Sequence, residues 1–313
     1  PASSGTGIIS ESLTNTSSVT IPVNYNIIMT SADGCVDSES ITVNVFPIPE
    51  LTSGAPISAI CSAEIFNHTL TSNVAGSINW TRASVTGISE PGTSGVDIIN
   101  ESLTNVTSAP ITVIYSSLLP SNSSGCSGSA ISFDLIVNPE PNVVQPIAQN
   151  LCEGEILDVA FVTTNTGGIS GYTWTNDNSS IGLPLSGSGD ISSITMTNTS
   201  SVNQIANIGV TPMFDNGGIS CPGPTKFFIV TVSPAAQVTP ISSQELCNGD
   251  SSLLITFSTS NTSGSTTYSW TNDNTSIGLN ASGSTDIAAF TATNTSTIPQ
   301  VATIVVTPNY TFS

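Results

Sequence analysis

A ten-residue segment recurs almost unchanged within this chain. It reads Trp-Thr-Asn-Asp-Asn-Ser-Ser-Ile-Gly-Leu at residues 174–183, and one residue differs in the copy at residues 270–279, about 96 residues later. A weaker copy begins at Trp80. Solenoid repeats and propeller blades have shorter units, so a period this long is that of a whole small domain. Each repeat is therefore expected to bury its own core.

A second marker has the same register. An Asn-x-Ser/Thr triplet follows a Gly-rich stretch in every copy, and it begins at Asn15, Asn105, Asn198 and Asn294. One of these stretches reads Gly-Ser-Gly-Asp-Ile, and the sequence favours a turn at residues 187–190. Two independent markers with one period indicate a true repeat array.

Short runs with strand character fill each repeat. Runs rich in Val, Ile and Thr lie at residues 39–45, 132–137 and 226–232, and each ends in a Pro-containing break. No 11-residue window has helical periodicity, and each complete unit has about seven strand-like runs, the profile of an immunoglobulin-like sandwich. The predicted fold is all-β, a tandem array of immunoglobulin-like β-sandwich domains arranged end to end.

The Pro-containing breaks set the expected domain boundaries. They predict the C-terminal part of one repeat at 1–47, complete repeats at 48–139 and 140–234, and the N-terminal part of a further repeat at 235–313. The first residues already lie inside a repeat, so we expect the chain to be a segment of a longer protein. Secretion is expected as well, because six cysteines recur at matching places in the repeats.

Charge excludes one class of partner. Only 7% of the residues are charged, the formal net charge is −19, and the two cations are Arg82 and Lys226. Binding a phosphate backbone requires clustered cations, so nucleic acid is not an expected partner. The 38% hydrophobic content argues for packed strands and against disorder.

The cysteines leave three disulfide connectivities open. Pairing within each repeat would join Cys61 to Cys126 and Cys152 to Cys221. Pairing across a boundary at the shorter spacing would require the Pro break to be a hairpin. A third pattern would join the turn after the first strand of one repeat to the turn before the last strand of the next, linking Cys61 to Cys221. The candidates are Cys35, Cys61, Cys126, Cys152, Cys221 and Cys247; sequence alone does not choose between the patterns.

Aromatic residues recur beside the repeated segment. Tyr172 and Trp174, and likewise Tyr268 and Trp270, alternate on one face of a strand, and Trp80 holds the same place with an aliphatic neighbour. We expect these five aromatic residues to be core residues. An aromatic platform for carbohydrate is the alternative.

Catalytic and metal-binding patterns are missing. The lone histidine, His68, lies in a strand-like run and is expected to be structural, so no catalytic residue is predicted. We also expect no cofactor. Calcium is the alternative, because aspartates recur beside Asn residues, although one carboxylate per turn holds a hard cation weakly. These aspartates are Asp177, Asp190, Asp273 and Asp286.

Four recurring features resemble the PKD-like repeats of very long secreted adhesins of Bacteroidota. They are the Trp-Thr-Asn-x-Asn-x-Ser-Ile-Gly-Leu segment, the Asn-Thr-Ser marker, Val-Thr-Pro, and the Val-x-Pro boundary followed by Leu-Cys-x-Gly. Within that class the chain is most similar to flavobacterial gliding-motility adhesins. The Trp-Asp-Phe-Gly-Asp-Gly signature of standard PKD domains is absent, since Trp174 is followed by Thr-Asn-Asp. The resemblance implies type 9 secretion, display at the cell surface, and coupling to a gliding motor.

A structural role is therefore the predicted function. The chain is expected to be a stalk segment of an extracellular, cell-surface adhesin filament, whose partners are neighbouring repeats, a polysaccharide or substratum bound by distal regions, and the motor and secretion components. Carbohydrate-binding modules are the alternative. A Gram-positive pilus shaft is a third candidate, but its Lys–Asn isopeptide bonds need a lysine in every repeat, and Lys226 is the one lysine.

Overall fold

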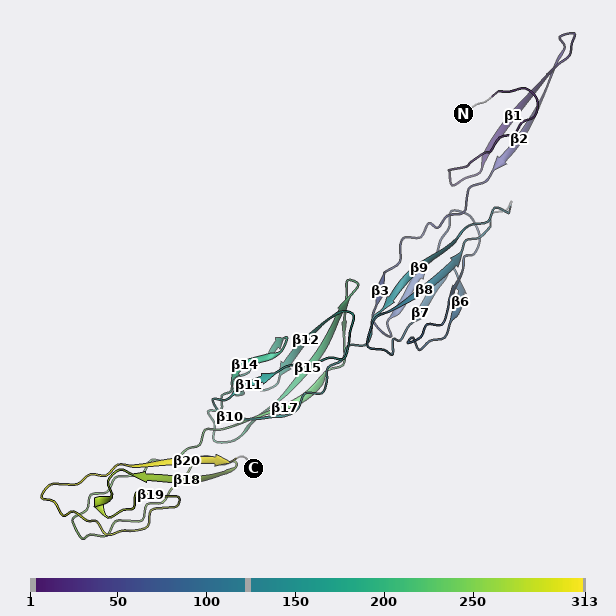
Figure 1. The fold of residues 1–313 in the computed structure, drawn as a ribbon. Coiled ribbons are helices and arrows are strands. Elements are labelled where there is room, and N and C mark those ends of the chain that lie inside the picture. Colours follow the sequence, from purple (N-terminus) through teal and green to yellow (C-terminus); the bar gives the residue numbers. More distant parts are fainter. Residues whose placement is uncertain (1–3, 122–124, 312–313) are drawn as a thin grey trace. The chain divides into compact units, whose positions relative to one another are not determined.

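The computed structural model describes residues 4–121 and 125–311, and this part of the chain is almost entirely β (Figure 1). Its helical segments are two 3-10 turns, η1 (Ser179–Ile181) and η2 (Thr275–Ile277). No helix of the described residues has the length and apolarity needed to cross a membrane. The prediction of an all-β fold is confirmed.

The repeated ten-residue segment forms one strand end and one 3-10 turn. Asn178 caps η1 by accepting a hydrogen bond from the Ser180 N–H, and Gly182 ends it with a φ of 87°. Asn274 and Gly278 do the same around η2. The sequence recurs because a capping side chain and a residue with positive φ are both needed at fixed positions.

The third repeat has the complete set of strands. One sheet has the order β10-β17-β15-β12-β13 with β16 paired to β15, and β11 and β14 form a second sheet. The strands are β10 (Gln149–Cys152), β11 (Ile156–Val159), β12 (Ile169–Asn176), β13 (Ser186–Ser188), β14 (Ile191–Thr195), β15 (Gln204–Asn216), β16 (Ile219–Pro222) and β17 (Lys226–Ser233). Side chains alternate along β12, so Trp174 enters a core that includes Leu157, Ile208 and Phe228.

The second repeat has the same plan. One sheet has the order β3-β9-β8-β5-β6, and β4 pairs with β7. The strands are β3 (Ala59–Ile60), β4 (Ile65–Thr69), β5 (Asn79–Arg82), β6 (Thr93–Val96), β7 (Ile98–Ser102), β8 (Ile111–Leu118) and β9 (Ala130–Val137). Its core includes Phe66, Trp80, Tyr115 and Leu135. Here β3 runs parallel to β9, as β10 runs parallel to β17.

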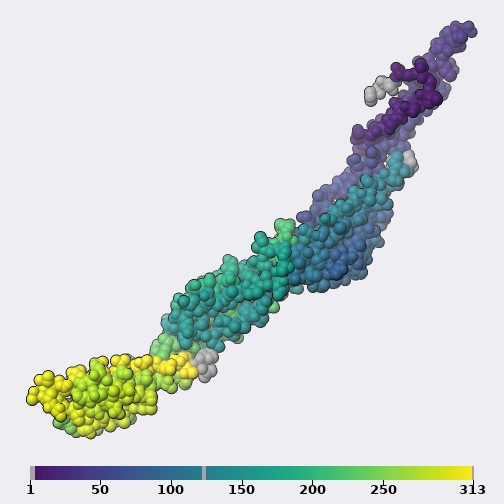
Figure 2. All heavy atoms as spheres, in the orientation of Figure 1, coloured from purple at the N-terminus to yellow at the C-terminus, as the bar shows by residue number. Residues whose placement is uncertain are grey.

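The first and fourth repeats have fewer strands among the described residues. The first, purple in Figure 2, has the hairpin β1 (Ile21–Thr30) and β2 (Val36–Val45), whose apolar Ile41 is 49% exposed. The fourth has β18 (Ser265–Asn272), β19 (Ser282–Gly283) and β20 (Ile304–Thr311). Residues 244–247 nearly repeat the β10 sequence yet form no strand there, because no described strand takes the place of β17.

Contacts between residues divide the chain into two compact units. The first contains Pro1–Pro141 together with Asn165–Ser170 and Phe214–Gly223, and the second contains Asn142–Thr164, Gly171–Met213 and Pro224–Ser313. Two short segments from the third repeat therefore pack within the unit of the second repeat. One of these segments carries a cysteine.

Candidate functional site

Cys61 begins a tight turn directly after β3. Its N–H donates to Glu64 Oε2 at 3.0 Å, and the Glu64 N–H donates back to the Cys61 carbonyl at 3.1 Å. Ala63 has a φ of 64°, and its N–H donates to the Leu103 carbonyl at 2.8 Å. These hydrogen bonds hold the Cys61 backbone in one position.

Cys221 lies in β16, which follows the tip of the β15–β16 hairpin. The tip is Asn216-Gly-Gly, and Gly217 and Gly218 have φ values of 64° and 78°, a region that glycine enters without a steric penalty. The Cys221 side chain is fully buried.

Cys61 and Cys221 form a disulfide across 160 residues of sequence, with their Cα atoms 5.6 Å apart. This distance lies in the usual range for disulfides. It establishes the third connectivity, in which a turn of one repeat is linked to a hairpin of the next. Pairing of Cys61 with Cys126 and of Cys152 with Cys221 is therefore wrong, and so is the hairpin alternative for both bonded cysteines.

An asparagine pair lies in the same compact unit. Asn138, which is fully buried, donates through Nδ2 to the Asn216 carbonyl at 3.3 Å, and Asn216 Nδ2 donates to Asn138 Oδ1 at 2.9 Å. The Asn138 N–H also donates to the Ile60 carbonyl at 2.9 Å. Because Ile60 precedes Cys61, the disulfide and the amide pair hold the same hairpin tip.

Two glycines allow the chain segments to approach each other closely. A Cβ atom at Gly223 would lie 2.1 Å from the Pro141 carbonyl oxygen, and one at Gly217 would lie 2.9 Å from the Ala59 Cβ. A second contact involves the loop 165–170, where the Thr166 N–H donates to the Ser108 carbonyl at 2.8 Å. We call the residues of these contacts, together with Cys61, Cys221 and the Asn138–Asn216 pair, the stapled contact.

The other cysteines are exposed and outside this disulfide; they are Cys35, Cys126, Cys152 and Cys247. The turns at Cys152 and Cys247 have the same backbone geometry as the turn at Cys61. The Cys152 N–H donates to Glu155 Oε2 at 2.7 Å, and the Cys247 N–H donates to Asp250 Oδ2 at 3.0 Å.

The Asn-x-Ser/Thr marker is a structural corner, a role that the sequence analysis missed. Asn105 Nδ2 donates to the Ala109 and Val137 carbonyls, both at 2.8 Å, and Oδ1 accepts from the Thr107 N–H and hydroxyl. Asn198 makes the same contacts, with Val232 as the distant acceptor. Asn105 and Asn198 therefore each tie the chain before one strand to the end of the last strand of the repeat. The signal was the recurrence of the triplet itself.

The three tryptophans lie in the sandwich cores. Trp80 is 5% exposed, and Trp174 and Trp270 are each 7% exposed. Each indole covers a glycine of the next strand, where a Cβ atom would lie less than 3 Å from the ring; these glycines are Gly95, Gly187 and Gly283. The half-buried Tyr172 and Tyr268 pack against the cores. None of the three indole faces is available to stack on a sugar ring.

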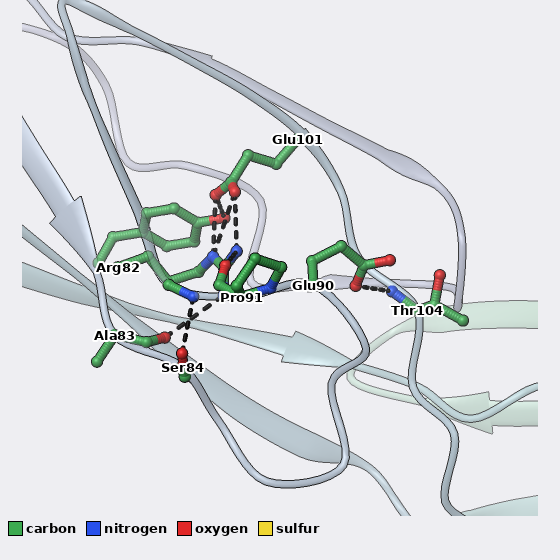
Figure 3. Close-up of polar contacts among 9 residues, drawn as sticks. Arg82, Ala83, Ser84, Glu90, Pro91, Glu101 and Thr104 are labelled. Carbon is green, nitrogen blue, oxygen red and sulfur yellow. Dashed lines mark hydrogen bonds and ion pairs between the residues drawn. The ribbon is translucent and has the colours of Figure 1, made fainter.

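The second repeat contains a buried ion pair between Arg82 and Glu101 (Figure 3). Arg82, 2% exposed, donates to Glu101 through Nε and Nη2, and the Tyr115 hydroxyl donates to Glu101 Oε2 at 2.6 Å. The hydrogen bond to Glu101 raises the pKa of Arg82, while burial and the Glu101 carboxylate raise the pKa of Tyr115. Arg82 Nη2 also donates to the Pro91 carbonyl. Every partner is part of the fold, which makes the cluster structural.

His68 lies in β4, and its ring packs against the rings of Phe66 and Phe133. Burial lowers the pKa of His68, and its Nε2 has no hydrogen-bond partner. An imidazole that packs against two aromatic rings and leaves Nε2 without a hydrogen-bond partner fits a packing role.

The recurring aspartates bind backbone amides. Asp177 and Asp273 accept from the N–H groups of Asn207 and Thr303, and Asp190 and Asp286 accept from those of Phe161 and Phe257. Within residues 4–121 and 125–311, no three His, Cys, Asp or Glu side chains gather in a way that could hold a metal ion. Each of the four carboxylates therefore accepts a hydrogen bond from the backbone and has a structural role.

The sheet topology, the cores and the recurring corners define a tandem array of immunoglobulin-like β-sandwich domains. Residues 2–49 and 58–141 match the model of the PKD-like domain family. Within these two stretches the chain is therefore similar to PKD-like domains. A disulfide such as Cys61–Cys221 is typical of extracellular proteins. No curated protein matches the chain.

Solved structures of tandem domains are similar to the chain. The N-terminal eight Ig domains of Down Syndrome Cell Adhesion Molecule have 15% identity and a TM-score of 0.33, covering 91% of this chain, which spans 45% of that structure. Titin domains I67–I69 have 11% identity and a TM-score of 0.32, with 69% and 75% coverage. Mouse cadherin-23 EC22-24 has 12% identity and a TM-score of 0.26, with 69% and 75% coverage.

Proposed function

We propose that this chain is a stalk segment of an extracellular cell-surface adhesin. The stapled contact carries the proposal. A disulfide and a reciprocal pair of amide hydrogen bonds join two successive repeats, which is what a load-bearing segment requires and what a free binding module does not. Such repeats act as spacers that hold the distal regions of the protein away from the cell, and these distal regions carry out adhesion.

The chemistry of the repeats supports a mechanical role. The indoles are in the cores, His68 packs against two aromatic rings, and the recurring aspartates bind backbone amides. The proposal therefore gives the repeats a mechanical role without a cofactor and without catalysis. Calcium chelation with EGTA is expected to leave the melting temperature unchanged; a clear decrease would restore the calcium alternative.

The resemblance to gliding-motility adhesins supports the cellular part of the proposal. On that basis the parent protein leaves the cell by type 9 secretion, is displayed on the surface, and is moved by a gliding motor. Partners are neighbouring repeats of the same chain, a polysaccharide or substratum, and the motor and secretion components.

Antibodies against residues 48–234 test this proposal on intact cells of the native host. We expect surface labelling that is lost when type 9 secretion is disrupted, and labelled points that move along gliding cells. Intracellular labelling alone would contradict the proposal. A glycan array with the purified chain provides the second arm: saturable binding of one class of polysaccharide would favour carbohydrate-binding modules.

A further inference from the structure

We infer that the Cys61–Cys221 disulfide is a bypass for tension, which passes from residue 61 to residue 221 through the sulfur atoms and leaves residues 62–220 unloaded. The inference takes its biological meaning from the proposed stalk function. Its physical content depends only on the covalent path of the chain.

The bypassed segment is large. The disulfide joins residues 160 apart in sequence, and between them lie β4 to β9 of the second repeat and β10 to β15 of the third. A pull applied to the two ends of a chain acts along its shortest covalent path. With the disulfide closed, these strands are a side loop, so most of both sandwich cores carries no tension.

In the second repeat, the loaded path is the stretch before Cys61. It is held by the Thr52 N–H donating to the Thr71 carbonyl at 2.8 Å, and by the parallel pairing of β3 with β9. Ala59 and Ile60 of β3 are fully buried, and the Ser58 carbonyl accepts from the Ile136 N–H at 2.9 Å. If this stretch were pulled away, β4 to β9 would stay folded, because they lie within the loop that the disulfide closes.

In the third repeat, the loaded path is the stretch from Cys221 through β17. A strand is already extended, at roughly 3.3 Å per residue, so pulling along its own axis releases little length. Seven residue pairs join β17 to β15, and four parallel pairs join it to β10 (Figure 1). Both neighbours belong to the side loop, so they hold β17 without being stretched themselves.

Reduction changes the path completely. A dithiol reagent gives up two electrons and two protons, becomes a cyclic disulfide, and leaves two cysteine thiols on the protein. Tension then runs through every residue from 62 to 220, and both sandwiches unfold in series. For a separation of 160 residues, complete extension adds roughly 500–600 Å of contour length.

Single-molecule stretching of the 313-residue chain tests the inference, with enzymatic peptide tags at both termini as handles. Cysteines outside the disulfide are changed to Ser so that thiol exchange cannot redirect the linkage: C35S, C126S, C152S and C247S. The oxidised chain is expected to release a total contour length shorter by roughly 500–600 Å than the chain treated with dithiothreitol. Equal lengths in the two states would overturn the inference.

The double variant C61S/C221S in the same background is the matched control. It should release the full length with or without dithiothreitol, and addition of reagent should change nothing. Non-reducing peptide mass spectrometry on the oxidised sample must find Cys61 linked to Cys221, and its absence would also overturn the inference. Failure of surface labelling would remove the stalk function and leave the length difference intact, so the two proposals fail separately.

Discussion

At the scale of single residues, the corner asparagines stabilise the repeats through hydrogen bonds to the backbone. Asn105 satisfies two backbone carbonyls and is itself satisfied by an amide and a hydroxyl. Asn294 in the fourth repeat has the local contacts, including Nδ2 to the Ile298 carbonyl at 3.0 Å, and is half-buried. The chain therefore contains a full corner and a partial corner of identical type.

Replacing Asn105 with Ala should lower the local unfolding free energy of the second repeat by about 2–4 kcal/mol, because buried carbonyls lose their donors. Asn294→Ala should cost the fourth repeat less, about 1 kcal/mol. Native-state hydrogen exchange of β8 and β20 peptides measures both values in one sample. Equal losses in the two repeats would contradict the importance of the bond to the last strand.

The Arg82–Glu101 pair offers a double-variant test, because Asn176 and Ile194 hold the equivalent positions in the third repeat. Arg82→Asn alone leaves a buried carboxylate without its cation and should cost about 3–5 kcal/mol. Arg82→Asn combined with Glu101→Ile should recover most of this loss, since no uncompensated charge is then buried. Urea titration of the second repeat measures both variants. A double variant as unstable as the single one would contradict this account.

His68 should make the second repeat sensitive to mild acid. Burial lowers its pKa in the folded state, so the unfolded chain takes up the proton at the higher pH. The contribution of neutral His68 is then fully present above the unfolded pKa of about 6.5 and is lost as pH falls below it. Urea midpoints at pH 7.5 and 5.0 should differ more in the parent than in His68→Gln. The same pH dependence in both proteins would exclude His68 as the cause.

At the scale of elements, sequence patterns located strands well wherever a Pro break ended them. The run expected at 226–232 is β17 (Lys226–Ser233), and the run expected at 132–137 is the end of β9 (Ala130–Val137). The turn expected at residues 187–190 is partly wrong, because Gly187 lies in β13 opposite Trp174. Glycine is needed at this position because the Trp174 indole covers it, and such a tertiary contact has no local sequence signal.

The disulfide pattern is the part of the site that sequence could not decide. Spacing allowed three connectivities, and the choice depends on where the β15–β16 hairpin tip lies relative to the turn at Cys61. That placement rests on Asn138 and Asn216, 78 residues apart, and on Gly223 beside Pro141. The repeat boundaries at residues 47, 139 and 234 stay a prediction.

Gly187→Ala tests the contact between β13 and the core. Its Cβ atom would lie 2.1 Å from a carbon of the Trp174 ring, so the indole must shift, and we expect a loss of about 1–3 kcal/mol. Gly189→Ala is the comparison without a side-chain clash, because nothing lies within 4 Å of its Cβ position; its φ of 70° adds backbone strain, which Gly187 does not have. Trp174 fluorescence should shift in the first variant only. An unchanged spectrum in Gly187→Ala would contradict the close contact.

At the scale of the whole molecule, scarcity of cations and the disulfide together predict an unusual trypsin digest. The two cleavage sites follow Arg82, which is buried in its ion pair, and Lys226, which is paired with Val210 in the sheet. Proteolysis requires local unfolding of the cleaved segment, so the native chain should be cut slowly. The chain denatured in urea should be cut quickly at both sites.

The denatured digest should give fragments 1–82, 83–226 and 227–313. Alkylation before unfolding blocks thiol exchange. The first two fragments contain Cys61 and Cys221, so a non-reducing gel should show them as one linked species beside fragment 227–313. Reduction should separate them, and the variant C61S/C221S should give three separate fragments without it. Three fragments from the parent chain under non-reducing conditions would exclude the linkage on which the bypass depends.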